Sequence, residues 1–167
     1  FNSAPRVAIE VDTPKDYDLN LGNGFLMRHG YTVMACGWQV DTPKKSALIT
    51  LQGHTVEGMT GRVYTQLQSQ TDTHNLLLSD KGHQAYPAAD MVEARAVLEV
   101  RDMPDTEAYS VPRDDWRFGR IDDDGNYISD PDYICSEQGF EKGRLYQIAY
   151  TTDWAPILGL SFAALRD

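Results

Sequence analysis

"GNGFLMRHGYTVMACGWQVD" (residues 22–41) is the stretch that decides the fold class predicted from the sequence. The apolar residues 25–27 predict a short helix, and Gly30 stands where a helix C-cap needs a residue that accepts positive φ. The apolar run over 31–38 predicts a strand buried on both faces, as in a parallel sheet flanked by helices. A helix, a glycine and a buried strand make half of a βαβ unit, so the expected fold class is α/β.

The pattern changes after Pro43, where alternation with a period of two replaces the continuous apolar run. This alternation recurs in four segments, at residues 47–53, 61–70, 94–101 and 143–151. Alternation with one polar face is typical of antiparallel sheet, so we expect these segments to pair mostly antiparallel.

Composition narrows the classes of partner. The chain has 167 residues, of which 41% are hydrophobic and 24% charged, as in an ordinary globular domain. Its net charge of −10 argues against a nucleic-acid partner, which requires a basic surface. No run of eighteen apolar residues is present, so no membrane span is predicted. The chain opens with Phe1 and without a leader, so we expect a trimmed start; the compartment stays open, secreted and periplasmic ones included.

The sequence predicts neither a metal site nor a cofactor. The loop "DDDGN" (residues 122–126) resembles a calcium loop, but alignment on Gly125 puts Arg120 and Pro131 at the first and twelfth ligand positions. The Asp-Gly pair of this loop predicts a hairpin turn instead. The four histidines share no ligand spacing and are expected to be solvated. They are His29, His54, His74 and His83.

The two cysteines do not form a disulfide scaffold. Cys36 lies in the predicted apolar strand, where a free thiol behaves as a small hydrophobe. A bridge between Cys36 and Cys135 is supported only by their spacing and by no geometry. The sequence leaves their redox state open.

Three segments together resemble the N-terminal half of a bacterial family of α/β-hydrolase domain proteins. They are the stretch quoted first, "DWRF" (residues 115–118) and "GRLYQIAYTTDWAPILGLSFAALRD" (residues 143–167). Members of that family carry "GNGFLMRRGYTVVWSGWQGD"-like and "YELVYTAKDPPVLGLGFAAVRD"-like segments at similar spacing. The chain departs from the family at "FNSAPR" (residues 1–6), where relatives have an "NRGNK"-like turn.

The resemblance implies part of an α/β-hydrolase fold with a large antiparallel β-rich insertion. Residues 1–167 would form one incomplete domain: a hydrolase-like core segment over 1–43, the β-rich insertion over 44–142, and a closing segment over 143–167. The closing segment would hold a strand and the start of the helix that precedes the nucleophile strand. That helix is expected to begin at Pro156, and its residues are apolar on nearly every side.

The function that the resemblance implies is that of a serine hydrolase, an esterase acting on a small carboxylic ester. Its nucleophile, acid and histidine would lie beyond residue 167, because this chain contains no G-x-S-x-G motif. No residue of this chain is therefore assigned as catalytic, and no cofactor is implied. We expect the chain alone to be inactive, with the remaining half of the hydrolase domain as its partner, either a second chain or a continuation of this one.

Four residues are candidates for the oxyanion site and the substrate pocket. Asn2 and Ser3 lie in the turn that would supply a backbone N–H to the developing oxyanion. Trp38 and Gln39 end the predicted strand at its C-terminal edge, where ligands bind in open α/β sheets. Trp38 can equally be an aromatic residue at the edge of the core, with Gln39 as the start of a loop.

Two other classes of function stay open. One is a non-catalytic binding module built on the β-rich segment, with Tyr64, Trp116 and Tyr127 among its contacts. The other is an interaction subunit that docks through its apolar C-terminal helix. The absence of a nucleophile motif permits both classes.

Overall fold

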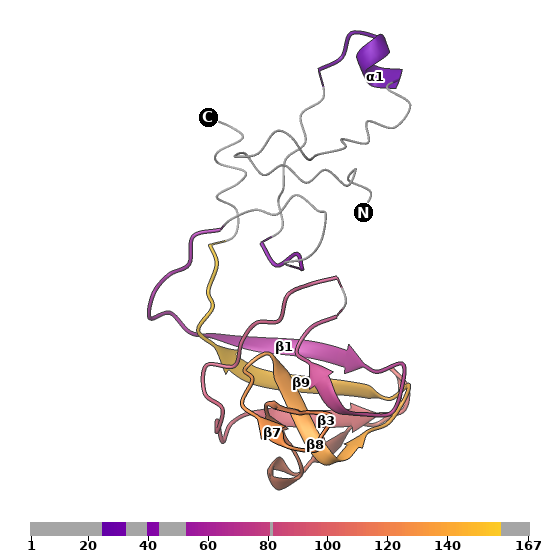
Figure 1. Ribbon diagram of the computed structural model, residues 1–167, viewed down its shortest axis with the longest axis vertical. Coiled ribbons are helices and arrows are strands. Elements are labelled where there is room, and N and C mark those ends of the chain that lie inside the picture. The colour runs from indigo at the N-terminus through magenta and orange to yellow at the C-terminus, as the bar shows by residue number, and fades with distance from the viewer. Residues whose placement is uncertain (1–24, 33–39, 44–52, 81, 158–167) are drawn as a thin grey trace. The chain divides into compact units, whose positions relative to one another are not determined.

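The computed structural model describes residues 25–32, 40–43, 53–80 and 82–157 (Figure 1). The chain divides into two compact units, one formed by Phe1–His54 with Ile157–Asp167 and the other by Thr55–Pro156. All of the described strands lie in the second unit, which we call the β-module.

The described part of the first unit contains one helical turn, α1 (Phe25–Arg28). Gly30 follows it with φ +79°, the positive value expected from the sequence for a residue that ends a helix. The next residue, Tyr31, is 64% exposed and is not in a strand. The rest of the strand predicted there, residues 33–39, lies outside the described residues, as do residues 44–52.

The predicted α/β class was wrong, because the described part of the chain is nearly all β-sheet. Its helices are α1 and the 3₁₀ turn η1 (Arg113–Asp115), and each is about one turn long. An α/β-hydrolase fold needs longer helices that cover the faces of a parallel sheet. Pro156, where a helix was expected to begin, forms an isolated β-bridge with Thr55 instead. Residues 158–167 lie outside the described part.

The larger sheet of the β-module has four antiparallel strands. Their order across the sheet is β1 (Gly61–Gln68), β9 (Leu145–Thr152), β3 (Val97–Arg101) and β4 (Tyr109–Val111). β1, β3 and β9 fall within or overlap three of the alternating segments, and their antiparallel pairing confirms what that alternation predicted. Figure 1 shows β1 and β9, which are far apart in the sequence, lying side by side.

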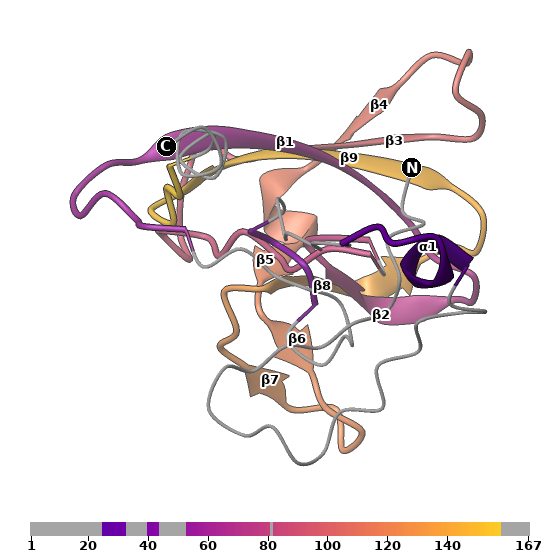
Figure 2. The same ribbon diagram turned by 90° about the horizontal axis from the view of Figure 1, so that it is seen from above.

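The smaller sheet has three antiparallel strands and forms a second layer. Their order is β2 (Thr73–Leu77), β8 (Tyr133–Phe140) and β5 (Arg117–Phe118). β6 (Arg120–Ile121) and β7 (Tyr127–Ile128) form a separate hairpin. In Figure 2, β1, β9 and β3 lie in one layer, and β5, β8 and β2 lie in the other.

The turn between β6 and β7 confirms the hairpin that the Asp-Gly pair predicted. Gly125 has φ +83°, a conformation that glycine adopts without strain. The Asp122 carboxylate accepts hydrogen bonds from the backbone N–H groups of Asn126 at 2.8 Å and Asp124 at 3.0 Å. The hydrogen bond from Asn126 is the first cause of a lowered pKa of the Asp122 carboxyl. This carboxylate therefore holds the turn together.

The core of the β-module lies between the two sheets and is bridged by aromatic pairs. Phe118 on β5 packs against Tyr150 on β9 with ring centroids 5.7 Å apart, and Phe140 packs against Tyr146 at 5.0 Å. The Tyr150 hydroxyl donates a hydrogen bond to the Tyr86 carbonyl at 2.6 Å, and burial raises the pKa of Tyr150. Each large apolar side chain buried in this way stabilises the fold by about 1.5–3 kcal/mol. The wholly buried ones include Leu98, Phe118, Ile134, Ile148 and Tyr150.

Candidate functional site

The site residues predicted for a hydrolase pocket cannot be compared with the structure. Asn2, Ser3, Trp38 and Gln39 all lie outside the described residues. Their convergence on one concave surface, and any role in holding an oxyanion, stay predictions.

Three aromatic residues were expected to contact a ligand, and Tyr64 is the most exposed of them. Trp116 is only 2% exposed and belongs to the core, so its expected role as a contact was wrong. Tyr127 is 41% exposed, but its hydroxyl donates to the Phe118 carbonyl at 2.8 Å and its ring lies 4.2 Å from the guanidinium of Arg117. Tyr64 is 67% exposed, and its hydroxyl makes no hydrogen bond within the described part of the chain. Tyr64 therefore marks the surface where a ligand could lie.

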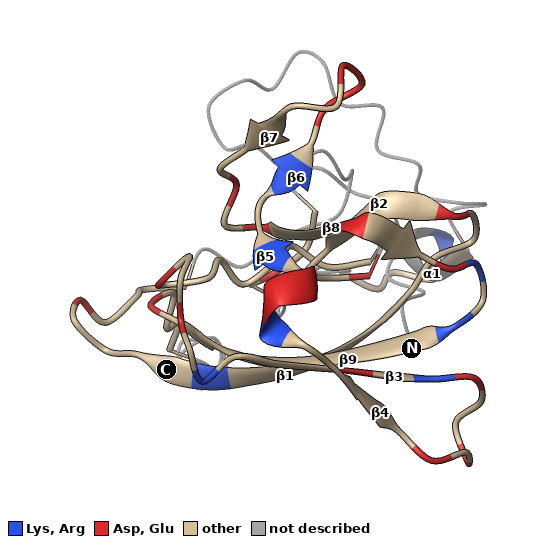
Figure 3. Ribbon diagram, turned by 90° about the horizontal axis from the view of Figure 1, so that it is seen from below, with Lys and Arg blue, Asp and Glu red and all other residues tan. Residues whose placement is uncertain are grey.

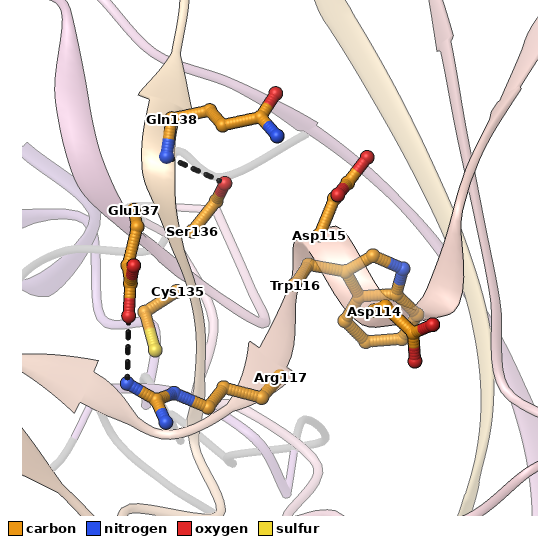
Figure 4. Close-up of a pocket in the computed structure, with 8 residues that line it drawn as sticks. All are labelled: Asp114, Asp115, Trp116, Arg117, Cys135, Ser136, Glu137 and Gln138. Carbon is orange, nitrogen blue, oxygen red and sulfur yellow. Dashed lines mark hydrogen bonds and ion pairs between the residues drawn. The ribbon is translucent and has the colours of Figure 1, made fainter.

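A pocket of about 260 Å³ lies between η1, β5 and β8 (Figure 4). Its walls are Asp114, Asp115, Trp116, Arg117, Cys135, Ser136, Glu137 and Gln138. It holds two side chains of nucleophile type, a thiol and a hydroxyl, together with three carboxylates. These are side-chain types that a catalytic site could use.

Neither nucleophile in this pocket is activated. Cys135 is 1% exposed, and burial raises the pKa of its thiol, which disfavours the reactive thiolate. The Ser136 hydroxyl accepts a hydrogen bond from the backbone N–H of Gln138 at 3.2 Å. His74, the base close to Ser136, contacts the Ser136 carbonyl oxygen through Nδ1 at 3.0 Å and not the hydroxyl. A serine or cysteine nucleophile needs a base on its own side-chain atom, which this geometry does not provide.

The charged groups of the pocket do not form a catalytic pair. Glu137 is 3.6 Å from Arg117, and the side chains of Asp114 and Asp115 project in different directions (Figure 4). Across the ranges that the structure describes, no three His, Cys, Asp or Glu side chains gather closely enough to hold a metal ion. The pocket therefore shows neither a paired acid and base nor a set of metal ligands.

Cys135 is expected to resist alkylation in the folded protein. Its burial and raised pKa leave little accessible thiolate at neutral pH, so iodoacetamide should react far more slowly than with the denatured chain. Mass spectrometry of a Cys36→Ser variant isolates the reaction of Cys135. Equal rates of modification in buffer and in denaturant would contradict the burial of this thiol.

The outward side chains of the four-stranded sheet form four rows. We call the first three the sheet face; the fourth, which contains Gln68 and Arg101, lies at its far end. The register places Arg62 opposite Thr151, Tyr64 opposite Ala149, and Gln66 opposite Gln147. The same register places Val97 of β3 on the other side of Ala149, and Glu99 beside Gln147. Successive rows are about 7 Å apart, because a strand rises roughly 3.4 Å per residue.

The first row is fixed by a buried carboxylate. Glu93 is 8% exposed and accepts hydrogen bonds from Arg62 Nη1 and from the N–H and hydroxyl of Thr151, each at 2.8 Å. Arg62 Nη2 also donates to the Arg95 carbonyl at 2.7 Å and to the Ala149 carbonyl at 3.2 Å. Arg62 is therefore held in place and its charge is balanced. The Arg95 guanidinium makes no hydrogen bond or ion pair with any residue that the structure describes.

A second pocket, of about 370 Å³, opens beside this row. It is lined by Thr60, Gly61, Arg62, Arg95 and Thr151. No aspartate or glutamate is among these lining residues. In a chain with a net charge of −10, this makes one end of the sheet face locally basic. In Figure 3 the ribbon is blue, the colour of Lys and Arg, near the start of β1 and at the end of β3.

The second row is the apolar part of the sheet face. Tyr64 is 67% exposed and Val97 is 43% exposed, whereas Ala149 between them is 9% exposed. The small alanine leaves a shallow floor between two larger side chains. An exposed aromatic ring beside such a floor offers a flat apolar surface to a ligand.

The third row offers hydrogen-bonding groups. Gln147 Oε1 accepts a hydrogen bond from Arg101 Nη2 at 2.6 Å, which leaves the amide NH₂ of Gln147 directed to other acceptors. The side chains of Gln66 and Glu99 make no hydrogen bond within the described residues. This row therefore presents two amides and a carboxylate about 7 Å from the Tyr64 row.

The chain was compared with protein-family models, curated proteins and solved structures, and none of them matches it. In the ranges that the structure covers, no helix is long and apolar enough to cross a membrane. The functional assignment therefore rests on the geometry of the sheet face and of the two pockets.

Proposed function

We propose that the β-module is a non-catalytic binding module that takes a saccharide on the sheet face. The observation that carries this proposal is the exposure of Tyr64 beside Ala149 and Val97, between two rows of polar side chains. The face of an aromatic ring is electronegative and attracts the C–H groups on the apolar side of a sugar ring. Amide and carboxylate groups donate to and accept from the surrounding hydroxyls.

The size and charge of the sheet face favour a saccharide over a macromolecular partner. Its apolar part consists of three side chains, whereas a standard protein–protein interface buries about 800 Å² on each partner around an apolar centre. A net charge of −10 opposes binding to a phosphate backbone. A short chain of sugar rings needs only one aromatic platform and a few hydrogen-bonding groups.

The non-catalytic part of the proposal is supported by the pocket of Figure 4, where Cys135 is buried and no base among the described residues contacts the Ser136 hydroxyl. The esterase activity implied by the family resemblance stays a prediction. It depended on residues 2–3 and 38–39, which lie outside the described part, and on groups beyond residue 167.

Tyr64→Ala is expected to weaken saccharide binding by at least about tenfold, because one aromatic platform carries most of the contact. The measurement is binding of the full chain to a panel of immobilised neutral and acidic oligosaccharides, followed by titration with the strongest binder. Tyr64→Phe should retain most of the affinity, since the ring is kept.

Tyr109→Ala is the matched control for this experiment. Tyr109 is 62% exposed but pairs with Val100, so it belongs to the opposite side of the sheet from Tyr64. Its loss should leave binding unchanged. Equal affinity of the wild-type and Tyr64→Ala proteins for the same oligosaccharide would contradict the proposed function.

A further inference from the structure

We infer that the ligand of the sheet face is an acidic saccharide whose carboxylate is bound by Arg95. This inference rests on the proposed function and adds the chemical class of the ligand. It follows from an asymmetry along the sheet face: among the described residues, neither the Arg95 guanidinium beside the first row nor the Glu99 carboxylate in the third row has a hydrogen-bond or ion-pair partner.

Arg95 is the residue that can bind an anion in the first row. Arg62 is already neutralised by Glu93 at 2.8 Å, and its second nitrogen is occupied by two carbonyl groups. Arg101, at the far end of the sheet face, donates to Gln147 at 2.6 Å and to the Pro104 carbonyl at 3.3 Å. No acceptor in the described part of the chain occupies the guanidinium of Arg95, and a guanidinium binds a carboxylate through two parallel hydrogen bonds.

The pocket beside Arg95 has the chemistry that a carboxylate needs. Its other walls are the hydroxyl-bearing Thr60 and Thr151, the backbone of Gly61, and Arg62. No carboxylate lines the pocket, so an incoming anion meets no direct repulsion there. Glu93 contacts Arg62 and Thr151 of this row, and its charge is balanced by Arg62.

The spacing fits a sugar acid. Arg95 lines the same pocket as Arg62 and Thr151, which face each other one row from Tyr64 and Ala149. A carboxylate bound in that pocket would lie one row, roughly 7 Å, from the sugar ring that rests on Tyr64. Glu99, one row beyond Tyr64, repels a carboxylate and accepts hydrogen bonds from hydroxyls, which fixes the direction of the ligand on the sheet.

The test is isothermal titration calorimetry of the full chain with trigalacturonate and with its carboxyl-reduced, neutral counterpart. The wild-type protein should bind trigalacturonate roughly tenfold more tightly at low salt, because a charge-assisted hydrogen bond is added. This preference should shrink as salt screens the charges. Arg95→Ala should remove the preference and leave the affinity for the neutral trisaccharide unchanged, since the Arg95 carbonyl that receives Arg62 is kept.

The remaining outcomes distinguish a failure of the acidic-ligand inference from a failure of the proposed saccharide binding. Arg117→Ala, a change in an exposed arginine on the other sheet, is the matched control and should keep the preference. A preference that survives in Arg95→Ala, or equal binding of the two trisaccharides by the wild-type protein, overturns the acidic ligand and leaves the saccharide site standing. Absence of binding to both trisaccharides overturns the acidic ligand, and absence of binding to every oligosaccharide of the panel as well overturns the proposed function itself. Binding of triglutamate as tight as that of trigalacturonate overturns the saccharide class.

Discussion

Phe118→Ala is expected to lower the free energy of unfolding by about 3–5 kcal/mol, the cost of removing a large buried aromatic side chain. Phe118 is wholly buried, and its ring lies 5.5 Å from that of Trp116 and 5.7 Å from that of Tyr150. It therefore joins the smaller sheet to the larger one. Urea denaturation followed by tryptophan fluorescence measures the change, because Trp116 reports directly on this part of the core.

Val92→Ala is the control for the loss of Phe118. Val92 is 79% exposed, so its truncation should change the free energy of unfolding by less than about 0.5 kcal/mol. Phe118→Leu should fall between the two, since it keeps part of the buried volume. A loss below about 1 kcal/mol for Phe118→Ala would show that the two sheets do not pack through this residue.

Glu93→Ala is expected to destabilise the protein by about 2–4 kcal/mol. The substitution leaves the Thr151 N–H without its acceptor and Arg62 without its counter-charge. The Arg62 side chain is 42% exposed, so water solvates part of it and keeps the loss below that of a fully buried pair. Chemical denaturation at constant pH and salt measures the effect.

An exposed ion pair provides the comparison for Glu93. Glu137 is 3.6 Å from Arg117, and its side chain is 84% exposed. Glu137→Ala should therefore cost no more than about 1 kcal/mol. Glu93→Gln should be intermediate, because it keeps an acceptor but loses the charge. Equal losses for Glu93→Ala and Glu137→Ala would mean that the first row of the sheet face is not held by Glu93.

Three strands of the larger sheet, β1, β3 and β9, could be predicted because each carries a local period of two, whereas β4 lies in a segment that was expected to be a turn-rich connection. In β1, alternation placed Tyr64, Gln66 and Gln68 on one side before any register was known. The hairpin at Gly125 could be predicted for a similar reason, since an Asp-Gly pair has few other uses between two short strands. The rows of the sheet face could not be predicted from the sequence, because they depend on the register of three strands that are distant along the chain.

The fold class was wrong because a short apolar run was given too much weight. The turn of helix at α1 and the positive φ of Gly30 were correct, but one helical turn does not determine an α/β architecture. β8 was missed because Ile134, Cys135 and Ser136 are buried in succession, which hides any alternation. Trp116 was misplaced because it stands in a turn-rich segment, where sequence alone does not reveal that distant strands bury it.

The pairing of β1 with β9 has a consequence for the synthesis of the protein. Gly61 pairs with Thr152, so β1 cannot form its backbone hydrogen bonds to β9 until the ribosome has synthesised β9. At a translation rate of about 5–20 residues per second, this wait is on the order of 5–20 s. Val63 and Leu67 of the nascent β1 are without their final neighbours during that time. A ribosome-associated chaperone that shields apolar segments would bind during this interval.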